Sequence, residues 1–144
     1  MSGDPILVEQ FGVFWVVRVP LYFVNAEFRV AVPPGVLVDF ASIPRLLWPF
    51  FSPIDPRYSR AAVLHDWLYA SHTHTRREAD RVLYASAREG HTGRGRAFLI
   101  WLAVRLFGRG PYRRGPARQL ALRRRYEHDT GIALGGPALQ EGSR

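Results

Sequence analysis

Four prolines fall within residues 44–56, in the stretch SIPRLLWPFFSPIDP (residues 42–56). Proline lacks a backbone N–H donor, breaks helix interiors and is excluded from inner strands. The stretch therefore predicts a structured aromatic loop with one short turn at residues 44–48, and it divides the chain into two parts with different patterns.

The part before this loop has the pattern of β-structure. FWVVRVPLYFV (14–24) and FRVAV (28–32) are rich in β-branched and aromatic residues and flank NAE (25–27), a short hairpin turn. Pro20 predicts an edge strand or a bulge, PPG (33–35) predicts a turn, and VLVDF (36–40) predicts one more short strand. Residues 6–40 are thus expected to form a small antiparallel sheet of two to four strands.

The part after the loop is helical. We expect a first helix at 60–70 with Ser59 as its N-cap, and a second from Arg76 to about Arg88, ending at Gly90. The second helix follows TRRE (75–78), the capping box in which Thr and a Glu three residues later pair with each other's backbone. The segment 96–107 is a third helix, closed by Gly108. It is apolar nearly all round, which predicts a central helix or one covered by a partner.

Beyond this helix, GRGPYRRGP (108–116) is expected to be a linker and 117–129 a basic helix. The predicted fold class is α+β: a small antiparallel sheet followed by three antiparallel helices. The expected division is a core domain at residues 1–108 and a basic C-terminal extension at 109–144.

The net charge of the chain is concentrated in this C-terminal third. Residues 1–93 hold nine Arg and nine acidic residues, whereas residues 94–144 hold eleven Arg and three acidic residues, the whole net charge of +8. Such a segment can bind nucleic acid, an anionic surface or an acidic protein, or be a solvated helix face. The candidate binding residues are Arg109, Arg113, Arg114, Arg118, Arg123, Arg124 and Arg125.

Composition excludes several classes of protein. The chain has no cysteine, so it has no disulfide or thiolate metal site. Its N-terminus lacks the basic and apolar regions of a signal peptide, and the apolar run 97–107 is about half the length of a membrane span. All twenty basic residues are Arg, which indicates a GC-rich genome and is compatible with a thermophilic source.

Four stretches in series carry a family resemblance: VDFASIPR (38–45), AAVLHDWLY (61–69), READRVLYASAREGH (77–91) and AVRLFGRGPY (103–112). They resemble the DUF1353 family of small phage and prophage proteins over roughly residues 28–112. The resemblance implies a phage or prophage setting, in the virion or in the host cytoplasm during assembly, and implies no particular activity.

The chemical candidates within this block are Asp39, His65, Asp66 and Asp80. Two helices joined by a short loop pack antiparallel, which can bring Asp80 near His65 or Asp66. One imidazole and three carboxylates suit Mg²⁺, Mn²⁺ or Zn²⁺ with a bound water, so one hypothesis is a metal-dependent hydrolase. Histidine–aspartate phosphohydrolases of the HD type fit poorly, because no His precedes His65.

The alternative is structural. Buried carboxylates need partners, and Asp39 could pair with Arg45, and Asp80 with Arg76 or Arg77. A weak metal site at His72 and His74, in the loop SHTHT (71–75), is a lesser hypothesis.

The functional expectation is therefore a phage structural or assembly protein of the tail region that acts through protein–protein contacts. It would be a homo- or hetero-oligomer with other phage structural proteins as partners. The sequence shows no P-loop, no nucleophile elbow and no Cys nucleophile, so the enzyme hypothesis is the weaker one. Nonspecific nucleic-acid binding through the arginine-rich C-terminus is the third hypothesis.

Overall fold

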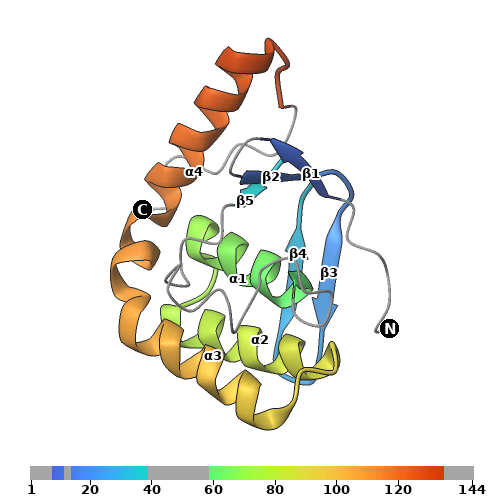
Figure 1. Ribbon diagram of the computed structural model, residues 1–144, viewed down its shortest axis with the longest axis vertical. Helices are drawn as coiled ribbons and strands as arrows, with labels where there is room; N and C mark the ends of the chain where they lie inside the picture. Colours follow the sequence, from blue (N-terminus) through green and yellow to red (C-terminus); the bar gives the residue numbers. More distant parts are fainter. Residues whose placement is uncertain (1–7, 12–13, 39–58, 135–144) are drawn as a thin grey trace.

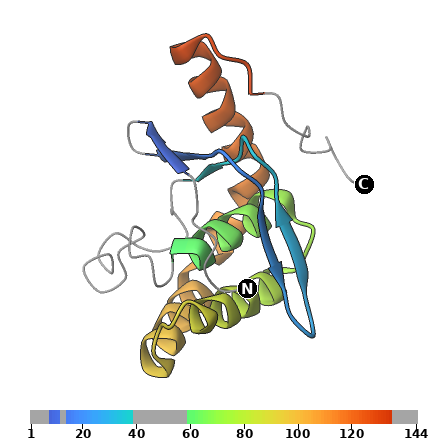
Figure 2. The ribbon, with the colours of Figure 1, turned by 90° about the vertical axis from the view of Figure 1, so that its right-hand side faces the viewer.

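The computed structural model describes residues 8–11, 14–38 and 59–134. Its first part holds the strands β1 (Val8–Phe11), β2 (Phe14–Val17), β3 (Leu21–Val24), β4 (Arg29–Val32) and β5 (Leu37–Val38). Its second part holds the helices α1 (Ser59–Ser71), α2 (Arg76–Glu89), α3 (Arg94–Phe107) and α4 (Arg109–Thr130). Helix α1 lies in the middle, between the β3–β4 hairpin and α4, and α2 and α3 lie together at one end (Figures 1 and 2).

The α+β class is confirmed, with more elements than expected. The described residues form five short strands in two antiparallel sheets, one with the order β1-β2-β5 and one made of β3 and β4. They form four helices rather than the three of the predicted fold class, and the fourth, α4, includes the basic helix expected at 117–129 but begins at Arg109. The Pro-rich loop and its expected short turn at 44–48 lie outside the described residues.

The β3–β4 hairpin turns at Asn25, as predicted. The side-chain Oδ1 of Asn25 accepts the backbone N–H groups of Glu27 at 2.8 Å and Phe28 at 2.7 Å, so the side chain mimics a backbone turn. Along β3, Leu21 and Phe23 are buried and the residues between them are exposed. This alternation presents one face of the hairpin to the core.

The role predicted for Pro20 is wrong. Pro20 forms neither a bulge nor part of an edge strand; it lies between β2 and β3, where the chain leaves the first sheet and enters the second. The predicted turn at 33–35 is confirmed. Gly35 there has a φ of 89° and donates its N–H to Val17 O at 2.8 Å, a left-handed conformation that glycine adopts without strain.

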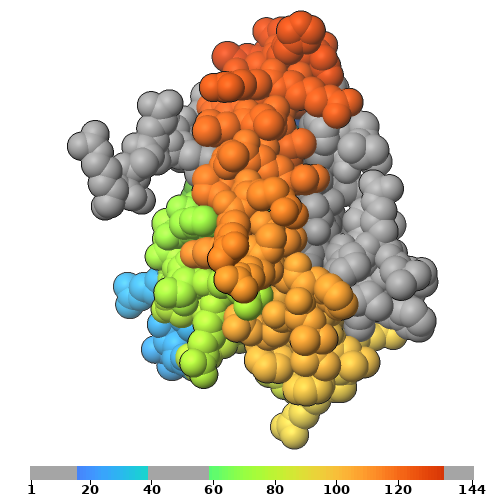
Figure 3. Space-filling view, turned by 90° about the vertical axis from the view of Figure 1, so that its left-hand side faces the viewer, coloured from blue at the N-terminus to red at the C-terminus, as the bar shows by residue number. Residues whose placement is uncertain are grey.

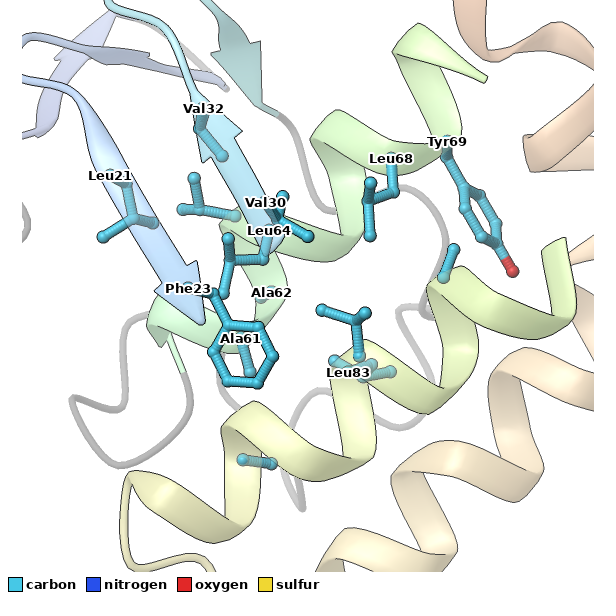
Figure 4. Packing of buried hydrophobic residues seen from close by; sticks show 14 of the residues in the cluster. Leu21, Phe23, Val30, Val32, Ala61, Ala62, Leu64, Leu68, Tyr69 and Leu83 are labelled. Carbon is cyan, nitrogen blue, oxygen red and sulfur yellow. The ribbon is translucent and has the colours of Figure 1, made fainter. Parts of the chain in front are cut away.

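The main core lies where the hairpin packs on α1 and α2 (Figure 4). Helix α1 is buried on most sides, and α2 contributes an apolar stripe of Ala79, Val82, Leu83 and Ala87. The buried residues that the close-up labels are Leu21, Phe23, Val30, Val32, Ala61, Ala62, Leu64, Leu68, Tyr69 and Leu83.

Helix α3 lies at the edge of this core rather than at its centre. Ala97, Ile100 and Val104 are buried against the other helices, while Leu99 and Leu106 are 53% and 66% exposed. No helix in the described part of the chain combines the length and apolar character needed to cross a membrane.

The predicted linker at 108–116 is wrong, because residues 109–116 form the first turns of α4 and Gly108 alone separates that helix from α3. Gly115 lets α4 approach α1 so closely that a Cβ there would lie 2.0 Å from Tyr69 O. Pro116 is inside the helix and cannot donate to Tyr112 O, and His72 Nε2 donates to that carbonyl instead, at 2.6 Å. Tertiary contacts thus stabilise a helix that glycine and proline disfavour.

Helix α4 also extends the first sheet. Gln119 Oε1 accepts the N–H of Leu37 at 2.9 Å, and its Nε2 donates to Leu37 O at 2.7 Å. The amide therefore pairs with β5 as a neighbouring strand would. Tyr126 and Leu134 pack with Val16 and Leu37 in a second, smaller core. The division at residue 108 remains a prediction, although α4 packs on both the sheet and α1.

Candidate functional site

The candidate site is built around Asp80, which α2 carries into the core. The predicted capping box is confirmed at the start of that helix. Glu78 N–H donates to Thr75 Oγ1 at 3.2 Å, and Thr75 N–H donates to Glu78 Oε1 at 3.0 Å. The box sets where α2 begins, and Asp80 follows in the next turn with its side chain fully buried.

Three side chains from two other helices surround the Asp80 carboxylate. His65 Nε2 lies 2.8 Å and Tyr69 OH 2.6 Å from Oδ1, both from α1, and Arg105 Nη1 of α3 lies 2.8 Å from Oδ2. We call these four residues the Asp80 cluster. It joins three helices through one carboxylate.

The electrostatics of the cluster favour an ionised Asp80. Burial alone would raise the pKa of Asp80, but the hydrogen bond and charge of His65, with the hydrogen bonds of Tyr69 and Arg105, lower it below its ordinary value. Because an ionised carboxylate only accepts hydrogen bonds, the Nε2–H of His65 donates. Burial, and then the charge of Asp80, raise the pKa of Tyr69, so its hydroxyl stays neutral and donates as well.

The cation paired with Asp80 is Arg105, so the expected pairing with Arg76 or Arg77 is wrong. Arg76 instead donates from Nη1 to Val104 O and Arg105 O, both at 3.2 Å. These carbonyls belong to the last turn of α3, where Val104 O also accepts the N–H of Gly108 at 2.8 Å. Arg76 thus caps α3 next to the residue that reaches Asp80.

Of the four predicted site residues, the structure brings His65 and Asp80 together. Asp66 follows His65 on α1, is partly buried, and is not a hydrogen-bond partner of Asp80. Asp39 lies outside the described residues, where its expected pairing with Arg45 also falls. Among the residues that the structure describes, no group of three or more His, Asp or Glu side chains could hold a metal ion. A metal site that includes Asp39 remains a prediction.

The sequence-based prediction missed two members of the cluster, Tyr69 and Arg105. A sequence feature pointed to each of them. Tyr69 stands four residues after His65, on the same helix face. Arg105 is a charged residue inside an otherwise apolar run, and such a residue needs a partner when it packs in a core.

The geometry of the cluster suits a structural role. His65 is 1% exposed and Asp80 0%, so neither presents an atom to a substrate through the described surface. General acid–base catalysis requires the catalytic group to reach its substrate. Only Arg105, whose side chain is 28% exposed, connects the cluster with the surface.

The loop histidines have separate roles. The ring of His72 stacks on Tyr112, with centroids 4.0 Å apart, while its Nε2 bonds to Tyr112 O. His74 Nδ1 lies 3.1 Å from Thr73 Oγ1, and its ring contacts Phe28 edge-on. His72 therefore contacts Tyr112, whereas His74 contacts Thr73 and Phe28.

The arginines proposed for nucleic-acid or partner binding lie on α4, which runs along one face of the molecule (Figure 3). Two of them face acidic residues one turn on: Arg123 lies 3.4 Å from Glu127 and Arg125 lies 3.7 Å from Asp129. Of these seven arginines, Arg123 is partly buried. The exposed ones are Arg109, Arg113, Arg114, Arg118, Arg124 and Arg125. The face is basic, as the sequence predicts.

Comparison with known proteins identifies relatives that bear no functional description. The chain is 44% identical over 71 residues to the uncharacterized protein y4iH of Sinorhizobium fredii (strain NBRC 101917 / NGR234), a match covering 49% of this chain and 30% of the relative. It is 28% identical over 98 residues to the uncharacterized protein y4jT of the same strain, covering 62% of this chain and 29% of the relative. The matches thus span less than a third of either relative. No solved structure matches the chain. The model of the family described as "Protein of unknown function (DUF1353)" matches residues 15–104, a range that contains His65, Tyr69 and Asp80 and ends one residue before Arg105. The chain belongs to that family.

Proposed function

We propose that this protein is a phage structural or assembly protein of the tail region that works by binding another protein through α3. The observation that supports this proposal is an apolar stripe on the surface of α3. Leu99 and Leu106 are 53% and 66% exposed, and Leu102 between them is partly exposed. Phe107, 58% exposed, extends the stripe at the end of the helix.

The spacing of the stripe suits a partner that lies along the helix. Leu99, Leu102 and Leu106 are related as i, i+3 and i+7, so they share one helix face. Apolar anchors with this spacing are how a helix docks into an apolar groove. Exposed apolar patches on soluble proteins commonly mark interaction sites.

The charge of α3 and α4 favours an acidic partner. Helices α3 and α4 together hold ten Arg and two acidic residues. A second copy of this chain would bring the same positive charge to the contact, which like-charge repulsion disfavours. The proposed occupant is therefore a different phage structural protein with an apolar groove and an acidic rim.

The test is whether the chain assembles into particles through this stripe. A tagged chain is expressed in a host that carries the gene, particles are induced and sedimented through a density gradient, and the tag is quantified in the particle fractions. We expect the wild-type chain in those fractions, and its loss with Leu99→Gln/Leu106→Gln. Val24→Gln is the matched control, since Val24 is 62% exposed on the hairpin.

Absence of the wild-type chain from particles and from their assembly intermediates would contradict the virion role. Equal incorporation of the Leu99→Gln/Leu106→Gln variant would contradict the role of the stripe.

The basic face of α4 supports a second candidate, nonspecific nucleic-acid binding. Neutralising phosphates with arginines releases counterions, so the affinity would fall steeply with salt. Fluorescence anisotropy with a labelled duplex across a salt series tests this. Binding that Arg113→Gln/Arg114→Gln/Arg124→Gln leaves unchanged, or that does not respond to salt, would exclude it.

A further inference from the structure

A pocket of about 490 Å³ opens between the β3–β4 turn, α2 and α3. The turn and these two helices lie at the same end of the molecule (Figure 1). The volume is within the range of small-molecule sites. We propose that this pocket binds a small aromatic anion, in which a phosphate or carboxylate group is joined to a flat ring.

The charge of the lining favours an anion. Arg77, Arg81 and Arg105 line the pocket, with Glu27 as an acidic neighbour. Arg81 pairs with Glu27 at 2.5 Å, but both side chains are about half exposed, and solvent weakens such a pair. Arg77 has no ion-pair partner among the described residues, so its charge is open to a ligand.

Arg105 connects the pocket with the buried Asp80 cluster. Its Nη1 donates to Asp80, but a guanidinium carries five N–H donors in a fixed plane, and within the described ranges no other side chain pairs with this guanidinium. Because His65 and Tyr69 hold the Asp80 carboxylate in place, Asp80 in turn holds the Arg105 guanidinium at the pocket wall. Planar, pre-positioned guanidinium groups bind phosphate and carboxylate in a bidentate manner.

Aromatic side chains supply the other part of the recognition. Phe98 and Trp101 line the pocket, with ring centroids 5.7 Å apart, and Phe98 is 50% exposed. Phe28 and Tyr84 line it as well. Flat rings gain from stacking on such faces. Arginines and rings in one pocket therefore favour a ligand that has both an anionic group and a ring.

This pocket is separate from the proposed docking stripe. Phe98, Trp101 and Arg105 are spaced by three and four residues and share one face of α3. The stripe of Leu99, Leu102 and Leu106 occupies the neighbouring face. The two proposals can therefore fail independently.

The experiment titrates the full chain with four probes and follows the indole ¹⁵N–H signals by NMR, with Trp101 assigned from Trp101→Phe. Adenosine monophosphate has a ring and a phosphate, 1-naphthoate has a ring and a carboxylate, and adenosine and inorganic phosphate are the separate parts. We expect at least one aromatic anion to shift the Trp101 signal and to bind about tenfold or more tightly than either separate part. Which of the two binds distinguishes a phosphate ligand from a carboxylate ligand.

Substitutions locate the site. Arg105→Gln is expected to weaken binding by about tenfold, the loss of one charged hydrogen bond. Arg77→Gln, a change of an exposed side chain, tests the same pocket if Arg105→Gln does not fold. Arg124→Gln, exposed on α4, is the matched control for the same loss of charge.

Three results would each overturn the proposal: no aromatic anion binds at millimolar concentration, adenosine or inorganic phosphate binds as tightly as the tighter of the two aromatic anions, or Arg124→Gln weakens binding as much as the pocket variants.

Discussion

At the scale of single residues, the buried Asp80 connects three helices. One buried carboxylate receives hydrogen bonds from His65, Tyr69 and Arg105, and so links α1, α2 and α3. Removing one member of a buried charged network lowers the stability of the fold by more than the intact network contributes to it, because the remaining charge stays buried without a partner.

Replacing Asp80 is therefore expected to destabilise the fold strongly. Asp80→Asn leaves Arg105 without its counter-charge, and we expect the free energy of unfolding to fall by about 3–5 kcal/mol, measured by urea denaturation. Glu27→Gln is the control, because it breaks the exposed Arg81–Glu27 pair and should cost about 0.2–1 kcal/mol. Similar losses in the two variants would mean that the cluster contributes no more than a surface pair.

The same carboxylate predicts how stability depends on pH. Since folding lowers the pKa of Asp80, its contribution is present above the unfolded pKa of about 4 and is lost as pH falls through the folded value. Urea midpoints of the wild type should thus decline more steeply below about pH 4 than those of Asp80→Asn. Parallel acid profiles for the two proteins would argue against an ionised Asp80 in the folded state.

At the scale of elements, α4 shows how packing overrides local preference. Its first turns contain Gly110, Gly115 and Pro116, residues that sequence reasoning assigns to a linker. The helix persists because Gly115 permits close contact with α1 and because His72 binds the carbonyl that Pro116 leaves unpaired. These partners are distant in sequence, so no local pattern reveals them.

Two glycine substitutions distinguish the effect of the close contact between α1 and α4 from the effect of helix propensity. Gly115→Ala places a Cβ 2.0 Å from Tyr69 O, a backbone atom that cannot move without shifting a helix, and overpacking of this kind costs about 1–3 kcal/mol. Gly95→Ala, in α3, meets no atom within 4 Å, and should stabilise by up to about 1 kcal/mol through helix propensity. Thermal unfolding midpoints should thus move in opposite directions. A rise for both variants would show that α1 and α4 are not in close contact.

At the scale of the whole molecule, α4 holds the sheet and the helices together. Gln119 pairs with both backbone groups of Leu37, and Tyr126 OH accepts a hydrogen bond from Arg18 at 3.1 Å. The net positive charge of the molecule lies on α3 and α4, which hold ten Arg and two acidic residues.

Truncation tests the expected division of the chain at residue 108. Without α4, Leu37 loses both hydrogen bonds of Gln119, and α1 loses the helix that covers it. We expect a chain of residues 1–108 to lose its cooperative thermal transition and its near-ultraviolet circular dichroism. A truncated chain with the full-length transition temperature would instead support an independent core with a basic extension.

The sequence by itself determined the local features. The Asn25 turn, the turn at Gly35 and the Thr75–Glu78 capping box each depend on residues that are close along the chain, and all are confirmed. The family was also recognisable, from four short stretches in a fixed order. The pairing of His65 with Asp80 was among the expected contacts, because antiparallel helices bring such positions together.

Only the tertiary structure decided which groups meet over longer distances. Arg105 reaches Asp80 across 25 residues, Gln119 reaches Leu37 across 82, and the pocket arises where a hairpin turn meets two helices. Side-chain chemistry allows many partners for a buried carboxylate, and only the relative positions of the packed helices select one. For that reason the sequence identified Asp80 as a residue that needs partners, and the fold supplied them.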